Sequence, residues 1–140
     1  MATRSSVLIK EGKKNILLYH HWDGYIEGVG FDLLKRFWLT KDRYFNNDKG
    51  FVFAETIANA LVKDIEANYE IVCFEHCDIE FLYVIDVKKR ELIANEVKFE
   101  YDEQKECYNK KIIKVWTFED IKKRYDELKG EQQNENQHAY

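Results

Sequence analysis

The residues best suited to chemistry in this chain lie in one stretch, residues 20–30, with the sequence HHWDGYIEGVG. The stretch holds two imidazoles, two carboxylates, two large aromatic side chains and three glycines. A carboxylate beside an imidazole orients the ring and raises its basicity, as a general base or a metal ligand requires. This concentration of reactive groups is more than a plain connector needs, and we take the stretch as the candidate functional site.

The candidate catalytic pair within this stretch is His21 and Asp23. Successive side chains of a strand point to opposite faces, so His20 and His21 cannot share one site easily. Asp23 lies two residues after His21 and shares its face if the strand continues. His21 would then serve as base or ligand, oriented by Asp23. The alternative is structural: His21 hydrogen-bonds the loop, while Asp23 caps a turn through its own backbone.

Gly24, Gly28 and Gly30 have the spacing G-x-x-x-G-x-G, between a strand pattern and a helix pattern. Backbone N–H groups at a helix start can bind anions, but this spacing matches neither the dinucleotide fingerprint nor the P-loop. We expect the glycines to shape turns with positive φ and a tight helix entry, with an anion site as the alternative. Trp22 and Tyr25 beside histidine would also suit the stacking of a flat ligand.

Composition places the chain among globular proteins of one domain. It has 140 residues, of which 45% are hydrophobic and 15% aromatic, so a disordered chain is excluded. The net charge of −4 makes a broad nucleic-acid surface unlikely, since that surface needs a basic face. No apolar run approaches the ~20 residues of a membrane span, and no signal peptide is recognisable. With three cysteines and no export signal, we expect reduced thiols in a cytoplasmic protein.

A second cluster combines Cys73, His76 and Cys77, with Cys107 as a further thiol. Zinc needs three or four such ligands. Alternatively, Cys77 could act as a nucleophile with His76 as its base. However, Cys73 lies in a hydrophobic run, where a small buried thiol is ordinary, and sequence neighbours rarely have the geometry of a nucleophile and base. We therefore expect these cysteine and histidine side chains to have only a structural role, with no metal and no cofactor.

Lysine and arginine residues gather where strands are predicted to end or turn, at positions 10, 13–14, 88–90 and 110–111. Charged edges and hairpin tips protect a sheet from aggregation, so we expect these side chains to be solvated. A nucleic-acid surface would need them to converge on one face.

Hydrophobic periodicity predicts an α+β fold: a single domain over residues 1–130, with an antiparallel or mixed sheet of about five to seven strands and about three helices mostly on one face. Residues 131–140 are polar, and we expect a disordered or loosely docked tail. Period-two patterns predict strands at 5–10, 16–21, 69–74, 80–87, 91–94, 97–101 and 111–116. Period-3.6 patterns predict helices at 31–39, 53–67 and 118–129.

Polar residues mark the ends of these elements. Residues 11–15 suit a hairpin connector, residues 40–50 a loop, and residues 102–109 a charged turn. Asn68 is a plausible helix stop, Thr117 can cap the last helix together with Asp120, and Gly130 can end that helix.

The opening of the chain resembles a group of small proteins encoded by phages and by bacteria that carry mobile elements. Its members share a T-R-S/A strand, a second strand and an H-W-D-G-Y-P-x-G-x-G loop. In this chain the matching residues are Thr3-Arg4-Ser5, His21-Trp22-Asp23-Gly24-Tyr25, Glu27-Gly28 and Gly30, whereas Ile26 stands where proline is usual. The resemblance covers residues 1–35 and carries no established activity.

This resemblance implies that Arg4 belongs with the loop residues. A hairpin register could place Arg4 beside Asp23 or Glu27, as a functional group or as a structural salt bridge. The candidate ligand-binding set is therefore Arg4, Trp22, Tyr25, Glu27, Gly28 and Gly30, with His21 and Asp23 as catalytic candidates.

Two functional hypotheses follow. The first is a small cytoplasmic protein, of phage or mobile-element origin, that binds a partner protein or a small ligand through residues 21–30. The alternative is a hydrolase or nucleotide-processing enzyme in which His21 acts as base, Asp23 orients it and Arg4 holds an anionic group. In a third, structural interpretation the loop serves only to stabilise the fold. Trp22→Ala or Asp23→Ala would then lower stability by a few kcal/mol and affect nothing else. The residues leave the ligand, the partner and the oligomeric state open.

Overall fold

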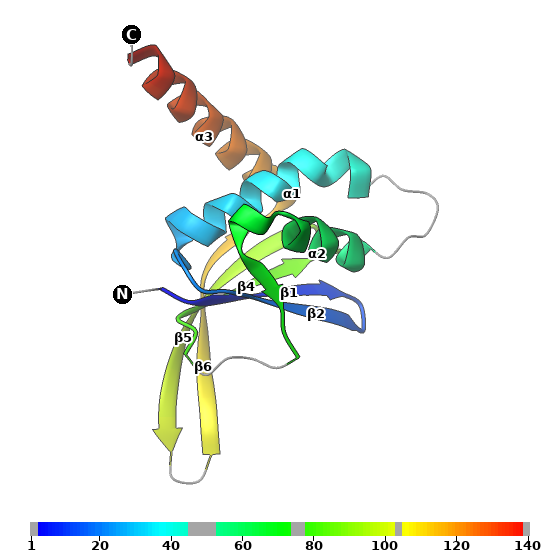
Figure 1. The fold of residues 1–140 in the computed structure, drawn as a ribbon, viewed down its shortest axis with the longest axis vertical. Coiled ribbons are helices and arrows are strands. Elements are labelled where there is room, and N and C mark those ends of the chain that lie inside the picture. The colour runs from blue at the N-terminus through cyan, green and yellow to red at the C-terminus, as the bar shows by residue number, and fades with distance from the viewer. Residues whose placement is uncertain (1–2, 45–52, 74–77, 103–104, 139–140) are drawn as a thin grey trace.

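A computed structural model describes residues 3–44, 53–73, 78–102 and 105–138 (Figure 1). In this part of the chain, one mixed six-stranded sheet carries three α-helices, mostly on one face. The predicted α+β class, the number of strands and the placement of the helices are confirmed.

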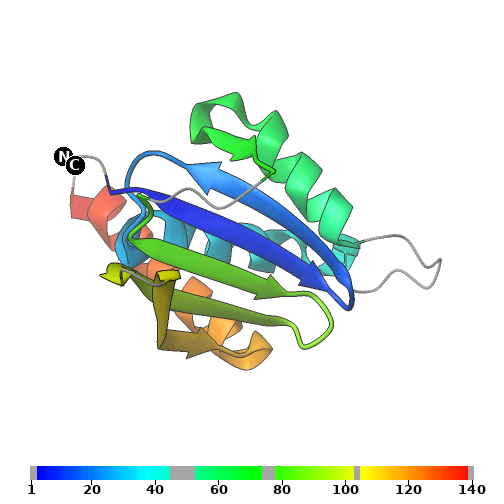
Figure 2. The ribbon, with the colours of Figure 1, turned by 90° about the horizontal axis from the view of Figure 1, so that it is seen from below.

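The sheet has the strand order β3-β2-β1-β4-β5-β6 (Figure 2). β1 and β4 pair in parallel at the centre, and every other pair is antiparallel. The parallel pairing brings the starts of β1 and β4 to the same end of the sheet, although they are far apart in the sequence. The strands are β1 (Ser5–Glu11), β2 (Lys14–His20), β3 (Tyr69–Ile71), β4 (Phe81–Asp86), β5 (Glu91–Asp102) and β6 (Lys105–Trp116).

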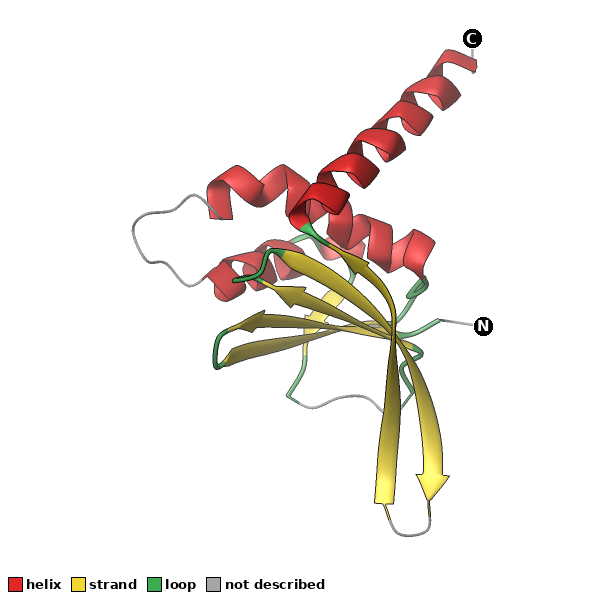
Figure 3. Cartoon of the chain, turned by 180° about the vertical axis from the view of Figure 1, so that it is seen from behind, coloured by secondary structure: helices red, strands yellow, loops and turns green. Residues whose placement is uncertain are grey.

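Two of the helices lie against the sheet. α1 (Phe31–Tyr44) and α2 (Phe53–Lys63) cover it, while α3 (Phe118–His138) packs its first turns on α1 and then projects away (Figures 1 and 3). A π-helix, η1 (Ile26–Gly30), leads into α1, and a 3-10 turn, η2 (Ile65–Ala67), follows α2. No described helix is long and apolar enough to cross a bilayer.

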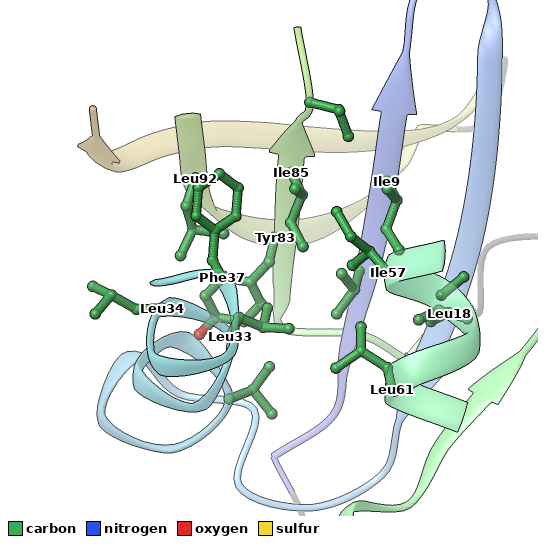
Figure 4. Packing of buried hydrophobic residues seen from close by; sticks show 14 of the residues in the cluster. Ile9, Leu18, Leu33, Leu34, Phe37, Ile57, Leu61, Tyr83, Ile85 and Leu92 are labelled. Carbon is green, nitrogen blue, oxygen red and sulfur yellow. The ribbon is translucent and has the colours of Figure 1, made fainter. Parts of the chain in front are cut away.

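The main core lies between the sheet and these two helices (Figure 4). Alternate strand residues point into it, and burial of each large side chain contributes roughly 1.5–3 kcal/mol. The labelled core residues are Ile9, Leu18, Tyr83, Ile85 and Leu92 from the sheet, and Leu33, Leu34, Phe37, Ile57 and Leu61 from the helices. A smaller cluster on the opposite face consists of Tyr19, Ile79, Leu82 and Val97.

Of two predictions at helix ends, one is confirmed in part and one in full. The helix predicted at 53–67 ends as α2 at Lys63, and Asn68, with φ 59°, closes the short turn η2 that follows, in the left-handed conformation that asparagine tolerates. At the start of α3, the N–H of Asp120 donates to Thr117 Oγ1 at 3.2 Å, and the N–H of Thr117 donates to Asp120 Oδ2 at 3.1 Å. This reciprocal pair is the acidic capping box that the sequence indicates.

The strand boundaries differ from those predicted in the hairpins. β1 runs to Glu11 and β2 starts at Lys14, so a two-residue turn with Gly12 at φ 60° replaces the expected connector. The strands predicted at 91–94 and 97–101 are one strand, β5, whose pairing with β6 shifts between Ala94 and Asn95, where Ile113 of β6 is the extra residue of a bulge. β5 and β6 also extend through most of the predicted turn at 102–109, because cross-strand pairing there outweighs the low β-propensity of charged residues.

Two of the helices are longer than predicted. α1 continues to Tyr44, into the region where we expected a loop. α3 passes through Gly130 to His138, so the predicted end at Gly130 is wrong, and residues 131–138 continue the helix where we expected a disordered or loosely docked tail. A glycine inside a helix costs only about 1 kcal/mol relative to alanine, and the glutamate and glutamine that follow are good helix formers.

Candidate functional site

The loop at residues 21–25 turns the chain sharply at the end of β2. The strand ends at His20, and Asp23 adopts φ 52°, in the left-handed region. The chain then enters η1, where the N–H of Phe31 reaches the carbonyl oxygens of Ile26 and Gly28. Such π-helical turns are rare and are frequent at functional sites.

The loop glycines are required by close packing rather than by positive φ. A Cβ on Gly24 would lie 2.8 Å from the carbonyl oxygen of Thr3, and a Cβ on Gly28 would lie 2.1 Å from that of Asp23. The carbonyl oxygen of Gly24 also accepts a hydrogen bond of 2.6 Å from the buried Tyr83 hydroxyl. Our expectation of positive φ at these glycines is wrong; the loop residue with positive φ is Asp23, while the expected tight helix entry is present.

The two adjacent histidines lie on opposite faces of the sheet, as predicted. His20 is on the helix face, where its Nε2–H donates to the carbonyl oxygen of Ala67 at 2.6 Å and its ring lies 4.8 Å from that of Tyr69. His21 is on the other face, with Nδ1 hydrogen-bonded to the Tyr19 hydroxyl at 3.0 Å. Its ring also meets Trp22 edge to face at 4.6 Å.

The structure does not bring His21 and Asp23 together. Among the described residues, no hydrogen bond joins them; Asp23 instead accepts one of 3.2 Å from the Tyr25 hydroxyl. The predicted pairing assumed that the extended backbone continues past His21. It fails because β2 ends one residue earlier and Asp23 turns the chain, so Asp23 lies on the side of His20.

Arg4 also has a partner other than the predicted ones. Its Nη1 lies 3.2 Å from Asp78 Oδ2, and no described ion pair joins it to Asp23 or Glu27. The cause is the parallel pairing of β1 with β4: the N–H of Glu80 donates to the Arg4 carbonyl oxygen at 2.9 Å, so Asp78 lies beside Arg4. The structural salt bridge that we considered for Arg4, with Asp23 or Glu27, is therefore wrong, and Arg4 pairs with Asp78, which the sequence pattern did not suggest.

An open hollow of about 450 Å³ lies on the helix side of the loop. It is formed by the end of β2, the loop, the start of α1, η2 and the start of β3. Sequence reasoning identified only part of its lining, although the i, i+4 spacing of Asp32 and Arg36 was a visible signal. The lining residues are His20, Trp22, Asp23, Gly28, Val29, Asp32, Arg36, Asp64, Glu66, Ala67, Asn68 and Tyr69.

Arg36 organises one wall of this hollow. Its guanidinium donates to Asp32 Oδ2 at 2.9 Å and to Asp64 Oδ2 at 2.5 Å, and it lies over the Tyr69 ring. The Tyr69 hydroxyl donates to Asp32 Oδ2 at 2.8 Å. Burial, reinforced by the Asp32 carboxylate, raises the pKa of Tyr69 far above its usual range, and the hydrogen bond from Arg36 lowers the pKa of Asp64.

The remaining charges make the hollow acidic. It contains four carboxylates and one guanidinium, which is already paired with Asp32 and Asp64. Neither Asp23 nor Glu66 forms an ion pair with any described cation. Trp22, which is 55% exposed, lies at the rim. Two unneutralised carboxylates beside an exposed indole favour a cationic group.

The other predicted site residues lie outside this hollow. Tyr25 and Glu27 are exposed, and Gly30 is buried against the Tyr83 ring. Cys73 is an exposed free thiol; His76 and Cys77 lie outside the described residues, as does the side chain of Cys107. Within the described ranges, no three histidine, cysteine or carboxylate side chains are placed to hold a metal ion.

Comparison of the chain with protein families, with curated proteins and with solved structures finds no match. The function must therefore be inferred from the residues and geometry of the site itself.

Proposed function

We propose that this protein binds a ligand bearing a guanidinium or ammonium group, either as a small molecule or as a side chain of a partner protein. The ligand would occupy the hollow beside residues 21–30. The observation that carries the proposal is the pair of carboxylates, Asp23 and Glu66, that no described cation neutralises beside the exposed Trp22.

The chemistry of each wall supports such a ligand. Carboxylates pair with guanidinium groups through charge-assisted hydrogen bonds, and the face of an indole attracts a cation by roughly 0.5–2 kcal/mol. Arg36 is paired with Asp32 and Asp64, which leaves Asp23 and Glu66 as the lining carboxylates for the ligand. The volume of about 450 Å³ suits a small molecule or a single long side chain.

The alternative, an enzyme with His21 as base, finds no support in this geometry. His21 is hydrogen-bonded to Tyr19, and Arg4 is paired with Asp78 on the face opposite the hollow. A binding protein therefore remains our proposal. The phage or mobile-element origin implied by the opening motif would suit an accessory protein that acts by binding.

The test is a titration at low ionic strength with Nα-acetylated argininamide (hereafter argininamide), whose only cationic group is the guanidinium. Nα-acetylated citrullinamide (hereafter citrullinamide) is the matched neutral probe. Binding is followed by NMR, through the indole N–H resonance of Trp22. We expect saturable shifts with argininamide only, and at least about tenfold weaker binding in Asp23→Asn/Glu66→Gln. Asparagine tolerates the left-handed conformation at position 23, so this variant should fold.

The matched control carries the same loss of two charges elsewhere, as Glu119→Gln/Asp126→Asn on the exposed side of α3. This control should bind argininamide like the original protein. Equal shifts with citrullinamide, or unchanged binding in the loop variant, would refute the proposal.

A further inference from the structure

The two edges of the sheet differ greatly in length. β3 forms one edge with three residues, whereas β6 forms the other with 12 residues. Among the described strands β6 pairs only with β5, so the N–H and C=O groups of its outer side have no strand partner. A long free edge of this kind is a template for an added strand.

The side chains along this edge are a mixture of lysines and β-branched apolar residues. Residues 109–115 are all exposed, including Ile112, Ile113 and Val115 at 59%, 37% and 40%. Lys110, Lys111 and Lys114 are interleaved with them. An edge strand with both exposed β-branched residues and lysines offers apolar contact and positive charge to the same incoming chain.

A second feature adds positive charge at the same place. A hollow of about 210 Å³ lies on the β5–β6 hairpin, lined by Lys98, Lys110 and Lys111 with Asn109 and Glu96. Its lining in the described part of the chain thus includes three lysines and one glutamate. The bulge at Ala94/Asn95 is a feature that bends strands, and the outer part of the hairpin projects away from the helices (Figure 3).

We propose that the β6 edge binds an extended acidic segment of a partner protein, which pairs with β6 as a seventh strand. Main-chain hydrogen bonds along residues 109–115 would supply affinity. Lys111 and Lys114 lie on the same face of β6, because the bulge residue Ile113 between them has no partner in β5, and they would select acidic side chains at alternate positions. This surface is separate from the acidic hollow beside residues 21–30 and has the opposite charge. The proposal therefore does not rest on the function proposed above.

A second copy of the chain fits this edge poorly. Because Ile113 is the extra residue of the bulge, an antiparallel pairing of β6 with itself about Ile112 would place Lys111 opposite Lys114. Like charges directly opposite each other destabilise a strand pair, so the lysines discourage self-association while they attract an acidic strand.

The experiment measures fluorescence anisotropy of a labelled peptide in which glutamate alternates with valine, titrated with the 140-residue chain. A second peptide has lysine in place of glutamate, and a third carries N-methyl groups on alternate amides, which remove the hydrogen bonds of one edge. We expect binding of the first peptide only, weakened at least about tenfold in Lys111→Glu/Lys114→Glu. The matched control Lys122→Glu/Lys123→Glu changes the same charge on α3 and should leave binding unchanged.

Amide hydrogen exchange on the complex then locates the peptide, with slower exchange expected at residues 109–115. Equal binding of the N-methylated peptide would show simple ionic adsorption and overturn the proposal. So would binding that the α3 variant weakens as much as the β6 variant. A dimer of the protein alone in sedimentation, lost in Lys111→Glu/Lys114→Glu, would assign the edge to a second copy instead.

Discussion

His20 and His21 are adjacent in the sequence but belong to two different regions of the molecule. His20 faces the helices and lines an acidic hollow with Asp32, Arg36 and Tyr69. His21 faces the opposite side, with Tyr19 close to the Arg4–Asp78 ion pair. A one-residue difference in strand position thus assigns one imidazole to the candidate binding site and the other to a surface hydrogen-bond cluster.

The two regions also differ in how they are assembled. The hollow draws its lining from α1, η2 and β3, and its polar groups form a connected network around Arg36. In the described part of the chain, the opposite region contains an exposed ion pair between Arg4 and Asp78 and a hydrogen bond between Tyr19 and His21, and the Arg4 guanidinium also interacts with Tyr19. We therefore expect changes on the hollow side to have larger effects, and the following experiments test that difference.

The largest effect should come from Gly28→Ala, which disturbs the loop that joins the two regions. The added Cβ would lie 2.1 Å from the carbonyl oxygen of Asp23, and backbone must move to relieve this clash. We expect the free energy of unfolding, measured by urea denaturation, to fall by about 2–3 kcal/mol. Gly130→Ala is the control, because nothing lies within 4 Å of its Cβ, and it should raise stability by up to about 1 kcal/mol. Similar stabilities for the two variants would mean that the loop does not hold the regions together.

The next comparison is Tyr69→Phe against Tyr19→Phe at neutral pH. The first removes a hydrogen bond to the Asp32 carboxylate, and we expect a loss of about 1.5–2 kcal/mol in the free energy of unfolding. The second removes a hydrogen bond to the His21 ring and should cost about 0.5–1 kcal/mol. The same urea experiment measures both losses. If the loss in Tyr19→Phe equals or exceeds that in Tyr69→Phe, the proposed difference between the regions is wrong.

Alkaline pH should lower the stability that Tyr69 contributes on the hollow side. Tyr69 is only 4% exposed, and burial raises its pKa in the folded protein, whereas in the unfolded chain tyrosine ionises near pH 10. The stability that Tyr69 contributes is therefore complete below about pH 10 and falls at higher pH, by up to about 1.4 kcal/mol per pH unit. Urea denaturation at several pH values between about 9 and 11 should show a shallower decline in Tyr69→Phe. A decline as steep as in the original protein would contradict this assignment.

The smallest effect concerns Asp64 at acid pH. Its hydrogen bond from Arg36 lowers its pKa in the folded state, so its contribution to stability is present above about pH 4 and is lost as the pH falls through the lowered value. We expect thermal unfolding of Asp64→Asn to depend less on pH below about 4 than that of the original protein. Asp126→Asn, which removes an exposed carboxylate on α3, serves as the control. If both variants respond to acid alike, the ion pair with Arg36 contributes nothing measurable.

Much of the fold could be predicted from the sequence because it depends on local patterns. Hydrophobic period distinguishes the helices from the strands, and Thr117 with Asp120 marks the start of α3. Asn68 marks the end of η2 for the same reason, since its left-handed conformation is a property of the residue itself. The location of the candidate site at residues 20–30 also followed from residue types alone.

The membership of the site could not be predicted, because it depends on pairing between distant segments. Arg4 lies beside Asp78 since β1 pairs in parallel with β4, and no local pattern specifies that neighbour. Asp64 and Tyr69 reach the hollow only through the packing of η2 and β3 against the end of β2.

The class of the fold, most of its elements and the loop that carries the candidate site follow from residue type and periodicity over short distances, so the amino-acid sequence is enough to predict them. That His20 rather than His21 lines the hollow with Asp23 depends on the folded structure. β2 ends at His20 and Asp23 turns the chain in a left-handed conformation, so side chains after His20 no longer alternate between the two faces of the sheet as they do in a strand. The chain makes that turn where Gly24 packs on the backbone of Thr3 and Gly28 packs on that of Asp23, and such contacts exist only in the folded protein.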